Sequence, residues 1–306
     1  MTRALFVVDA GAGVGFGHFR RSSFLFRAFQ ARGIDCRMIV PQGASLNGVW
    51  SEPLGAWPDD LAKLENADIL VADSYRIDLS IMQDWKQRFD LRLMIDDNAD
   101  RPLDADYILN HNIYAPTLNY NGMCSAGALT GLDYCLIDPR FAELRSRPLQ
   151  TASRIVVSFG GSDMTRGLET ATEILQADSD VLVDVILPAM PDGADTVNDP
   201  RLSVLVLPDM IDTMSRGTVY VGGAGVTTWE AAAAGLSIVV CRIADNQVRM
   251  IPALRNAGIR AFDDYDAGQL AQGAIAEMAK PVTGNPLSHI IDGQGAARAV
   301  DAVLGT

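Results

Sequence analysis

The chain has 306 residues, which exceeds the usual size of a single hydrophobic core and predicts two domains of roughly 150 residues each. Hydrophobic residues make up 48% of the sequence and charged residues 21%, a composition that excludes a disordered or fibrous protein. The formal net charge is -13 and no block of Lys or Arg stands out, which argues against a nucleic-acid partner.

The apolar segments and the cysteines indicate a cytoplasmic protein. Residues 4–8 are too few for the core of a signal peptide, and the apolar stretch 231–241 is too short to span a bilayer. The cysteines are widely separated and lack the close pairs of a zinc site or a redox motif: Cys36, Cys124, Cys135 and Cys241. We therefore expect reduced thiols and no integral membrane segment.

Short apolar runs alternate with amphipathic helical patterns along the chain, which is typical of parallel α/β construction. In the first half we expect strands at 4–8, 37–40, 69–72, 91–95 and 107–109, and helices at 19–32 and 79–89. In the second half we expect strands at 154–159, 182–187, 204–207, 219–221 and 238–241, and helices at 167–177, 227–234, 248–257 and 267–279.

A polar run without periodicity, residues 143–153, separates the two halves and is the predicted linker. The predicted fold class is therefore α/β, with two Rossmann-like domains at 1–147 and 148–306 that face a cleft. Ligands of doubly wound sheets bind beyond the carboxyl ends of the strands, so polar residues that directly follow a strand are candidates for the site.

The first strand runs into a glycine-rich loop that ends in His18, where a helix begins. Such a loop favours phosphate because glycine lets the backbone approach closely and the helix start offers unpaired N–H groups. It is a poor dinucleotide fingerprint, since Phe16 stands where the third glycine belongs. A neutral imidazole at this place can take a proton from water, whereas a helix cap or a packing role is the alternative for His18.

Two further glycine turns follow strands of the second half. In Val219–Glu230, Thr227 and Thr228 can donate hydroxyls to phosphate, and Glu230 either accepts ribose hydroxyls or complements the helix dipole. The turn at Ser158–Asp163 has the same choice between phosphate binding and a plain connection.

Polar residues also follow two strands of the first half, in Asp73-Ser-Tyr75 and Asp96-Asp97-Asn98. Their carboxylates suit acid/base chemistry, and helix capping or turn formation is the alternative. Asp96 and Asp97 need not face one another, and no cluster with metal-ligand spacing accompanies them.

Taken in chain order, these elements resemble the family of UDP-2,4-diacetamido-2,4,6-trideoxy-β-L-altropyranose hydrolases, which act in pseudaminic acid biosynthesis. The resemblance spans most of the chain and is carried by these blocks: Gly15-Phe-Gly17-His18-Phe-Arg-Arg21, Asp73-Ser-Tyr75, Ile95-Asp-Asp-Asn-Ala-Asp-Arg101, Leu109-Asn-His-Asn112, Gly131-Leu-Asp-Tyr-Cys-Leu-Ile-Asp-Pro-Arg-Phe141, Ser158-Phe-Gly-Gly-Ser-Asp163, Gly225-Val-Thr-Thr-Trp-Glu230, Ala244-Asp-Asn-Gln247 and Asp292-Gly-Gln-Gly-Ala296.

The resemblance implies a GT-B architecture, with the catalytic histidine and the sugar on the side of domain 1–147 and UDP bound by domain 148–306. It implies that His18 activates water for attack at the anomeric carbon, with release of UDP and with neither a metal nor a cofactor. The expected substrate-binding residues are Gly15, Gly17, Arg21, Tyr75, Asp97, Asn246 and Gln247. The expected UDP-binding residues are Gly160, Gly161, Ser162, Gly223, Ala224, Gly225, Thr227, Thr228 and Glu230.

The chain departs from the family pattern at three positions. Ser22 stands where family members often have Cys, and Asp138 and Arg140 reverse two charges of the pattern. These departures leave open a different nucleotide sugar or an acceptor other than water. Two alternatives therefore stand beside hydrolysis: a GT-B glycosyltransferase that uses the same histidine, and a sugar-nucleotide binding protein without turnover.

Overall fold

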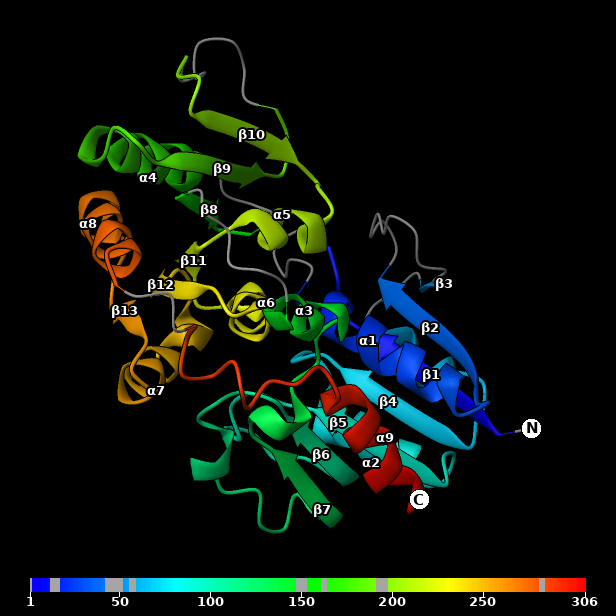
Figure 1. The fold of residues 1–306 in the computed structure, drawn as a ribbon. Helices are drawn as coiled ribbons and strands as arrows, with labels where there is room; N and C mark the ends of the chain where they lie inside the picture. Colours follow the sequence, from blue (N-terminus) through cyan, green and yellow to red (C-terminus); the bar gives the residue numbers. More distant parts are fainter. Residues whose placement is uncertain are drawn as a thin grey trace. The chain divides into compact units, whose positions relative to one another are not determined.

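The computed structural model describes residues 2–11, 17–41, 52–54, 59–146, 153–160, 164–190, 198–280 and 284–306. The chain divides into two compact units, which Figure 1 shows as separate sheets with their helices. Unit 1 comprises Met1–Ile137 and Gln294–Thr306, and unit 2 comprises Asp138–Gly293. Each unit is α/β with its own parallel sheet, as the alternation of strand and helix patterns predicts.

The described sheet of unit 1 has seven parallel strands in the order β3-β2-β1-β4-β5-β6-β7. Its elements are β1 (Arg3–Val8), α1 (Gly17–Ala31), β2 (Asp35–Pro41), β3 (Glu52–Leu54), β4 (Ile69–Asp73), α2 (Leu79–Trp85), β5 (Leu91–Ile95), β6 (Ala105–Asn110), β7 (Cys124–Thr130) and α9 (Gly295–Leu304). Alternate side chains of β1 enter opposite cores: Phe6 and Val8 pack with α1 and α9, whereas Leu5 and Val7 pack with α2.

The described sheet of unit 2 has six parallel strands in the order β10-β9-β8-β11-β12-β13. Its elements are α3 (Arg140–Glu143), β8 (Arg154–Ser158), α4 (Thr165–Ala177), β9 (Leu182–Leu187), β10 (Leu202–Val206), α5 (Met210–Arg216), β11 (Val219–Gly223), α6 (Val226–Ala234), β12 (Ser237–Cys241), α7 (Met250–Asn256), β13 (Arg260–Phe262) and α8 (Ala267–Met278). Val157, Val183 and Val221 bury one face of this sheet under α4 and α8.

The boundary between the units corrects the predicted division at residues 147 and 148. The chain leaves unit 1 after Ile137, and it returns at Gln294 to add α9 to the first sheet. The small apolar face of α9, with Ala299 and Val300 fully buried, packs in the core of unit 1. Its first residue, Gly295, lies so close to the backbone of Cys135 that a Cβ atom would stand 2.3 Å from the carbonyl oxygen, and only glycine fits there.

Several helices and strands of the structure were not predicted from the sequence. The short strands β3 and β13, the exposed strand β7 and the helices α3, α5 and α9 were not predicted. The predicted linker at 143–153 begins inside helical structure, since α3 runs into a 3-10 turn at Leu144–Ser146, and residues 147–152 lie outside the described part. Short elements of this kind bury too few residues to show a period.

The cysteines are free thiols: Cys36, Cys135 and Cys241 are buried and Cys124 is half-buried. Burial raises the pKa of Cys36 and of Cys241 to about 12, so these thiols stay protonated and unreactive, in agreement with a structural role. No helix within the described residues combines the length and the apolar character that a membrane crossing requires.

Candidate active site

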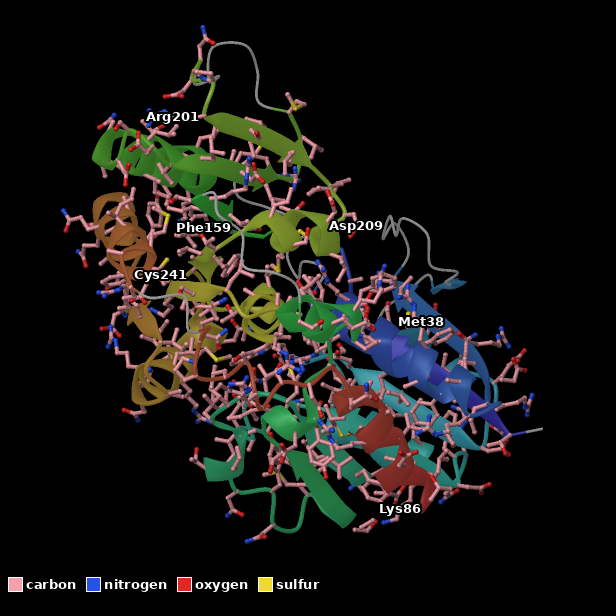
Figure 2. All side chains as sticks on the ribbon, viewed as in Figure 1. Met38, Lys86, Phe159, Arg201, Asp209 and Cys241 are labelled. Carbon is pink, nitrogen blue, oxygen red and sulfur yellow. The ribbon has the colours of Figure 1, made fainter. Side chains whose placement is uncertain are left out.

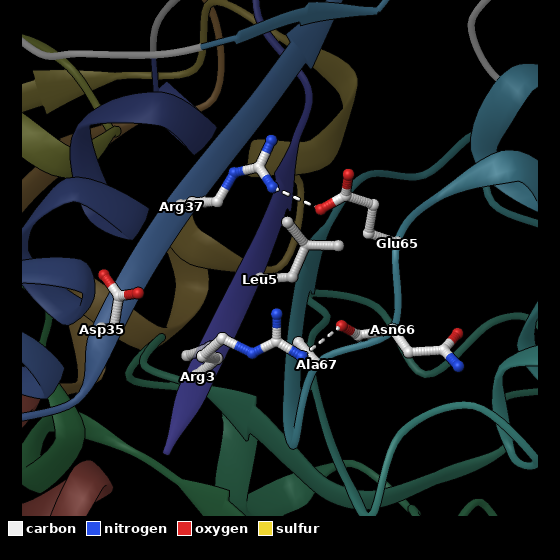
Figure 3. A pocket seen from close by; sticks show the side chains of 8 residues that line it. Arg3, Leu5, Asp35, Arg37, Glu65, Asn66 and Ala67 are labelled. Atoms are coloured by element: carbon white, nitrogen blue, oxygen red, sulfur yellow. Dashed lines mark hydrogen bonds and ion pairs between the residues drawn. The ribbon is translucent and has the colours of Figure 1, made fainter. Parts of the chain in front are cut away.

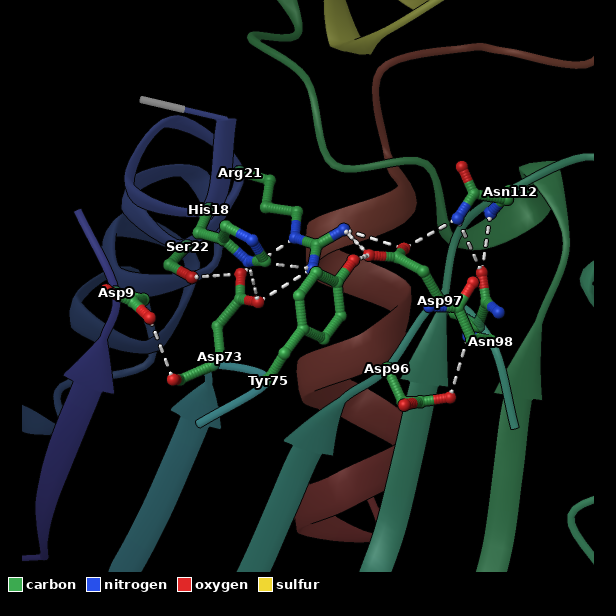
Figure 4. Close-up of polar contacts among 12 residues, drawn as sticks. Asp9, His18, Arg21, Ser22, Asp73, Tyr75, Asp96, Asp97, Asn98 and Asn112 are labelled. Atoms are coloured by element: carbon green, nitrogen blue, oxygen red, sulfur yellow. Dashed lines mark hydrogen bonds and ion pairs between the residues drawn. The ribbon is translucent and has the colours of Figure 1, made fainter. Parts of the chain in front are cut away.

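Polar side chains gather at the carboxyl edge of the unit 1 sheet (Figure 4). His18 and Arg21 lie in the first turns of α1, Asp73 ends β4, and Asp97 follows β5. Because β1, β4, β5 and β6 are neighbours in the sheet, residues that are far apart in the sequence meet at this edge. Asn112, two residues beyond β6, completes the row.

His18 is held by the carboxylate of Asp73. Nδ1 of His18 lies 2.6 Å from Oδ1 of Asp73, and both side chains are buried. Burial alone would raise the pKa of Asp73, but the charges of Arg21 and His18 and their hydrogen bonds hold it well below its usual range. The ionised carboxylate can only accept, so in the neutral imidazole the proton is on Nδ1 and the lone pair is on Nε2.

Asp73 is itself fixed by three further donor contacts. Arg21 donates Nη2 to Oδ1 at 2.6 Å and Nε to Oδ2 at 2.7 Å, and Ser22 donates its hydroxyl to Oδ2 at 3.0 Å. Nη2 of Arg21 also approaches Nδ1 of His18 at 3.2 Å, but its shorter bond to Asp73 takes precedence. The orientation of the imidazole is therefore set by a carboxylate that has no freedom to turn.

Arg21 links this carboxylate to a second one. Its Nη1 donates to both oxygens of Asp97, at 2.8 and 2.9 Å, while its side chain keeps only 6% exposure. Burial would lower the pKa of Arg21, but the two carboxylates raise it well above its ordinary value. The guanidinium thus holds Asp73 and Asp97 together, and the predicted contact of Arg21 with substrate stays untested.

Tyr75 forms an aromatic wall beside the histidine. Its ring meets that of His18 edge to face, with centroids 4.9 Å apart and an interplanar angle of 80°, and 37% of the residue is exposed. Its hydroxyl donates to Asp97, and burial together with that carboxylate raises the pKa of Tyr75. The Asp97 carboxylate, despite burial, has its pKa lowered to about 2 by Arg21 and by the Tyr75 hydroxyl.

The polar network continues away from His18 through residues that were not among the predicted site residues. Asn112 donates to Asp97 at 2.6 Å and to Asn110 at 2.9 Å, and Asn110 donates to the Tyr120 hydroxyl at 2.8 Å. Tyr120 in turn donates to Asp96 at 2.9 Å. The signal was an Asn-His-Asn triplet directly after an apolar strand, which is the same signal that pointed to Asp97.

Asp96 and Asp97 have separate roles, as their adjacency in the sequence suggested. Asp96 accepts the backbone N–H groups of Asn98 and Ala99 at 3.0 and 2.7 Å, so it shapes the turn after β5. Asp97 belongs to the charged network and caps no helix. Within the described residues, no group of three or more His, Cys, Asp or Glu side chains is placed to hold a metal ion.

His111 contributes structure rather than acid/base chemistry. It is 1% exposed, and its Nδ1 accepts the backbone N–H of Leu136 at 3.0 Å. Burial, followed by the positive charge of Arg21, lowers the pKa of His111 to about 4. The imidazole is therefore neutral at physiological pH. Its hydrogen bond joins Leu136, near the end of the first segment of unit 1, to the residue that directly follows β6.

In unit 2 the glycine turn between β11 and α6 is built by close backbone packing. A Cβ atom on Gly222 would stand 2.0 Å from the carbonyl oxygen of Ser158, and one on Gly223 would stand 2.4 Å from Ile243. Ala224 is buried, and Gly225 occupies the N-cap position of α6. The turn thus brings bare backbone to the start of a helix, where N–H groups attract anions.

Of the polar side chains that follow this turn, one is partly exposed and two are fully buried. Thr227 is half-buried, whereas the fully buried Thr228 donates its hydroxyl to the carbonyl of Gly223 at 3.1 Å. This internal bond corrects the prediction that the Thr228 hydroxyl is available to phosphate. Glu230 is also fully buried beneath the turn, so the predicted contact with ribose stays a prediction.

The remaining predicted residues are spread over both units. Gln247 accepts the N–H of Ile243 at 2.8 Å and places Nε2 3.9 Å from the Cβ position of Gly225, so it belongs to the glycine turn of unit 2. Asn246 is exposed beside it in the 3-10 turn Asp245–Gln247. Gly17 begins α1 and is exposed, and Gly160 has a φ of 88° after β8. Gly15, Gly161 and Ser162 lie outside the described residues.

Arg166, which was not among the predicted residues, lies near the start of α4. Its guanidinium stands 5.3 Å from the centre of the Tyr265 ring, and that ring packs against Phe159. Figure 2 labels Phe159, which lies just beyond β8. The Tyr265 ring therefore contacts both the Arg166 guanidinium and Phe159, the residue before Gly160. No sequence pattern marked Arg166, because the aromatic partner comes from a distant segment.

A small surface pocket of about 20 Å³ lies at the opposite, amino-terminal edge of the unit 1 sheet (Figure 3). It is lined by Leu5 and by the ion pair of Arg37 with Glu65, whose atoms are 2.6 Å apart. This volume suits about one water molecule. The pocket is therefore separate from the candidate site around His18.

No family model matches the chain. Over 182 residues, or 56% of this chain, it is 24% identical to the UDP-2,4-diacetamido-2,4,6-trideoxy-beta-L-altropyranose hydrolase of Campylobacter jejuni subsp. jejuni serotype O:2. The matched part spans 65% of that relative, so nearly two thirds of its length is represented.

Solved structures cover almost the whole chain. They include CalG4, the calicheamicin glycosyltransferase (TM-score 0.65, 14% identity, 99% of this chain and 98% of that one), and the MurG of Acinetobacter baumannii (0.61, 15%, 100% of both). The complex of MnaA from S. aureus with UDP is similar as well (0.63, 11%, 98% and 95%). At such identities the likeness establishes the fold, and the chain has an α/β fold of two Rossmann-like domains of the GT-B type.

Proposed function

We propose that the chain hydrolyses UDP-2,4-diacetamido-2,4,6-trideoxy-β-L-altropyranose, or a close analogue, to the free sugar and UDP. The observation that carries the proposal is the 2.6 Å contact between His18 and Asp73, which leaves Nε2 of His18 as a base at the carboxyl edge of the sheet. The hydrolase of Campylobacter jejuni is the relative whose name supplies this substrate.

In the proposed reaction, Nε2 of His18 takes a proton from water as the water oxygen attacks the anomeric carbon. The bond from that carbon to the diphosphate oxygen breaks, and UDP leaves with the electron pair, so the configuration inverts. Asp73 stabilises the imidazolium that forms, and the proton then passes to solvent. General-base catalysis of this kind contributes roughly 10² to 10⁴-fold to the rate.

We assign the binding of UDP to unit 2. The first turn of α6, which begins at Val226 directly after Gly225, would present backbone N–H groups, and Thr227 and Gln247 lie at the same place. The N–H groups of Ala224 and Gly225 are already bonded to the carbonyls of Cys241 and Gly223. Fixed dipoles stabilise the negative charge that grows on the leaving diphosphate without further reorganisation. In this proposal the positive end of the α6 dipole meets the charge of the leaving diphosphate, and the step involves no cation.

A glycosyltransferase is the second candidate, and the structural likeness to CalG4 and to the MurG of Acinetobacter baumannii favours it. In that reaction the same His18 would deprotonate a sugar hydroxyl in place of water. Asp138 and Arg140, which depart from the hydrolase pattern, form an ion pair at 2.7 Å with one another. Their charges therefore compensate each other locally. A sugar-nucleotide binding protein without turnover is the third candidate.

UDP release from the purified protein separates the candidates. We expect release from the diacetamido UDP-sugar in buffer alone. Release that requires an added sugar acceptor would establish the transferase, and tight binding without release would establish the binding protein.

Asp73→Asn tests the mechanism directly. The amide can donate to Nδ1 of His18 and so favours the wrong tautomer, and we expect kcat to fall roughly 10² to 10⁴-fold with little change in KM. Asp97→Asn is the matched control, since it removes a carboxylate from the same network but leaves the contact between His18 and Asp73. An Asp73→Asn variant that is folded and as active as Asp97→Asn would refute the role of the pair.

A further inference from the structure

The side-chain carbonyl of Asn112 is an acceptor that the network leaves open. Asn112 is 7% exposed, and its Nδ2 donates to Oδ1 of Asp97 and to Oδ1 of Asn110. Across the stretches that the structure describes, no donor reaches Oδ1 of Asn112. Figure 4 shows this oxygen directed past the carboxyl ends of the strands, with Asn112 at one end of the row of polar side chains and His18 at the other.

The orientation of this amide is determined by its partners. Asn110 donates Nδ2 to the Tyr120 hydroxyl at 2.8 Å, so its own Oδ1 faces Asn112 and accepts both the backbone N–H and Nδ2 of that residue. Asp97 is ionised and can only accept. Turning the Asn112 amide over would set its oxygen against two acceptors, and therefore the open group is a carbonyl.

We propose that Oδ1 of Asn112 accepts a hydrogen bond from the amide N–H of an acetamido group on the sugar, and so selects for that substituent. This inference rests on the proposed function, which supplies a sugar with two acetamido groups. An acetamido N–H is a donor only, and the Asn112 carbonyl is an acceptor only, so the two are complementary. A substituent with oxygen in place of N–H would set two acceptors against each other.

The position of Asn112 also relates the sugar to the base. One amide binds both Asp97 and the sugar, and Arg21 joins Asp97 to Asp73, the partner of His18. The contacts within the protein are charge-assisted hydrogen bonds between buried groups, which are the strong and directional ones. The position of a sugar bound to Asn112 is therefore fixed relative to the imidazole through the side chains of Asp97, Arg21 and Asp73.

The test compares the diacetamido UDP-sugar with two analogues, in which oxygen replaces the amide nitrogen at C2 or at C4 to give an acetate ester. For the wild-type protein we expect kcat/KM to fall roughly 10- to 100-fold with one of the two analogues, because a buried acceptor loses its donor. For Asn112→Ala we expect a similar loss with the parent sugar but less than twofold discrimination between parent and ester.

Ser22→Ala is the control, since it removes a hydroxyl that binds Asp73 but leaves every contact of Asn112 and of Asn110. It should retain the discrimination between parent and ester, whatever its effect on stability. Equal rates of the wild-type protein with parent and both esters would overturn the inference, as would a Asn112→Ala variant that still discriminates. If the wild-type protein turns over none of these sugars, hydrolysis fails, and dissociation constants for the same three ligands still decide the role of Asn112.

Discussion

In each unit a parallel strand is followed in the sequence by glycines and then by a helix, α1 in unit 1 and α6 in unit 2, yet the starts of the two helices are chemically different. The first turns of α1 carry His18, Arg21 and Ser22, and all three bond to the single buried carboxylate of Asp73. The start of α6 is built instead from glycine backbone packed at van der Waals limits. The first helix start therefore holds an imidazole against a carboxylate, and the second brings glycine backbone to the beginning of a helix.

The largest difference between the two helix starts is expected from a substitution of His18. We expect His18→Ala to lower the rate of UDP release roughly 10² to 10⁴-fold, because the base is lost while the diphosphate turn in unit 2 is untouched. His289→Ala is the matched control, since His289 is an exposed histidine of unit 2. Wild-type rates in a folded His18→Ala protein would show that α1 does not carry the base.

The pH dependence of stability tests the role of His111, the buried histidine of unit 1 whose pKa is lowered in part by Arg21 of α1. The pKa of His111 is lowered from 6.5 to about 4, so its contribution to folding is complete above pH 6.5 and is lost as the pH falls toward 4. We expect the free energy of unfolding to drop by about 3 kcal/mol over this window on account of His111.

Asn is the informative replacement for His111, because its Oδ1 can accept the N–H of Leu136 but it does not titrate. Chemical denaturation of His111→Asn between pH 7 and pH 4 should lack this part of the decline. His289→Asn should keep it, and an identical pH profile for wild type and His111→Asn would contradict the assignment.

Two glycines before α6, Gly222 and Gly225, test how closely the backbone is packed in unit 2. Gly222→Ala places a methyl group 2.0 Å from the Ser158 carbonyl oxygen, and we expect it to lower the free energy of unfolding by about 2 to 3 kcal/mol. A Cβ atom on Gly225 has no neighbour closer than 3.9 Å, so Gly225→Ala should fold normally. Thermal unfolding of both variants measures this, and equal stabilities would mean that the turn is not closely packed.

The smallest expected effects are those of Thr227 and Thr228 in α6, one on UDP binding and the other on stability. Thr228→Val removes one of two donors to the carbonyl of Gly223, which still accepts the N–H of Gly225 at 2.9 Å, and should cost about 1 kcal/mol of stability. Thr227→Val should leave stability unchanged and weaken UDP binding several-fold, as measured by calorimetry. If the two substitutions exchange these effects, the phosphate contact lies with Thr228.

The fold and the centre of the site were accessible from sequence, because both depend on local patterns. Apolar strands of ordinary length gave ten of the elements with bounds correct to a few residues, and a polar residue after a strand marked His18, Tyr75 and Asp97. The roles within the site were not accessible. Whether Arg21 meets substrate or two carboxylates depends on Asp73 and Asp97, which come from strands far along the chain.

The same limit explains the errors. Thr228 was assigned to phosphate because hydroxyls at a helix start suit anions, but burial turns its hydroxyl onto Gly223. The network from Asn112 to Tyr120 joins three segments and has no local period. The unit boundary was misplaced because α9 was not predicted, and the core that it joins is formed by residues far back in the sequence.

The return of α9 to the first sheet has a consequence for synthesis on the ribosome. Ala299, Val300 and Val303 belong to the core that also contains Phe6 and Leu25, so this core lacks part of its lining until the chain has been translated almost to residue 303. Unit 2 is encoded between the two parts of unit 1 and can close earlier. The segment that is made first is therefore completed last, and its exposed apolar face is a natural target for chaperones during translation.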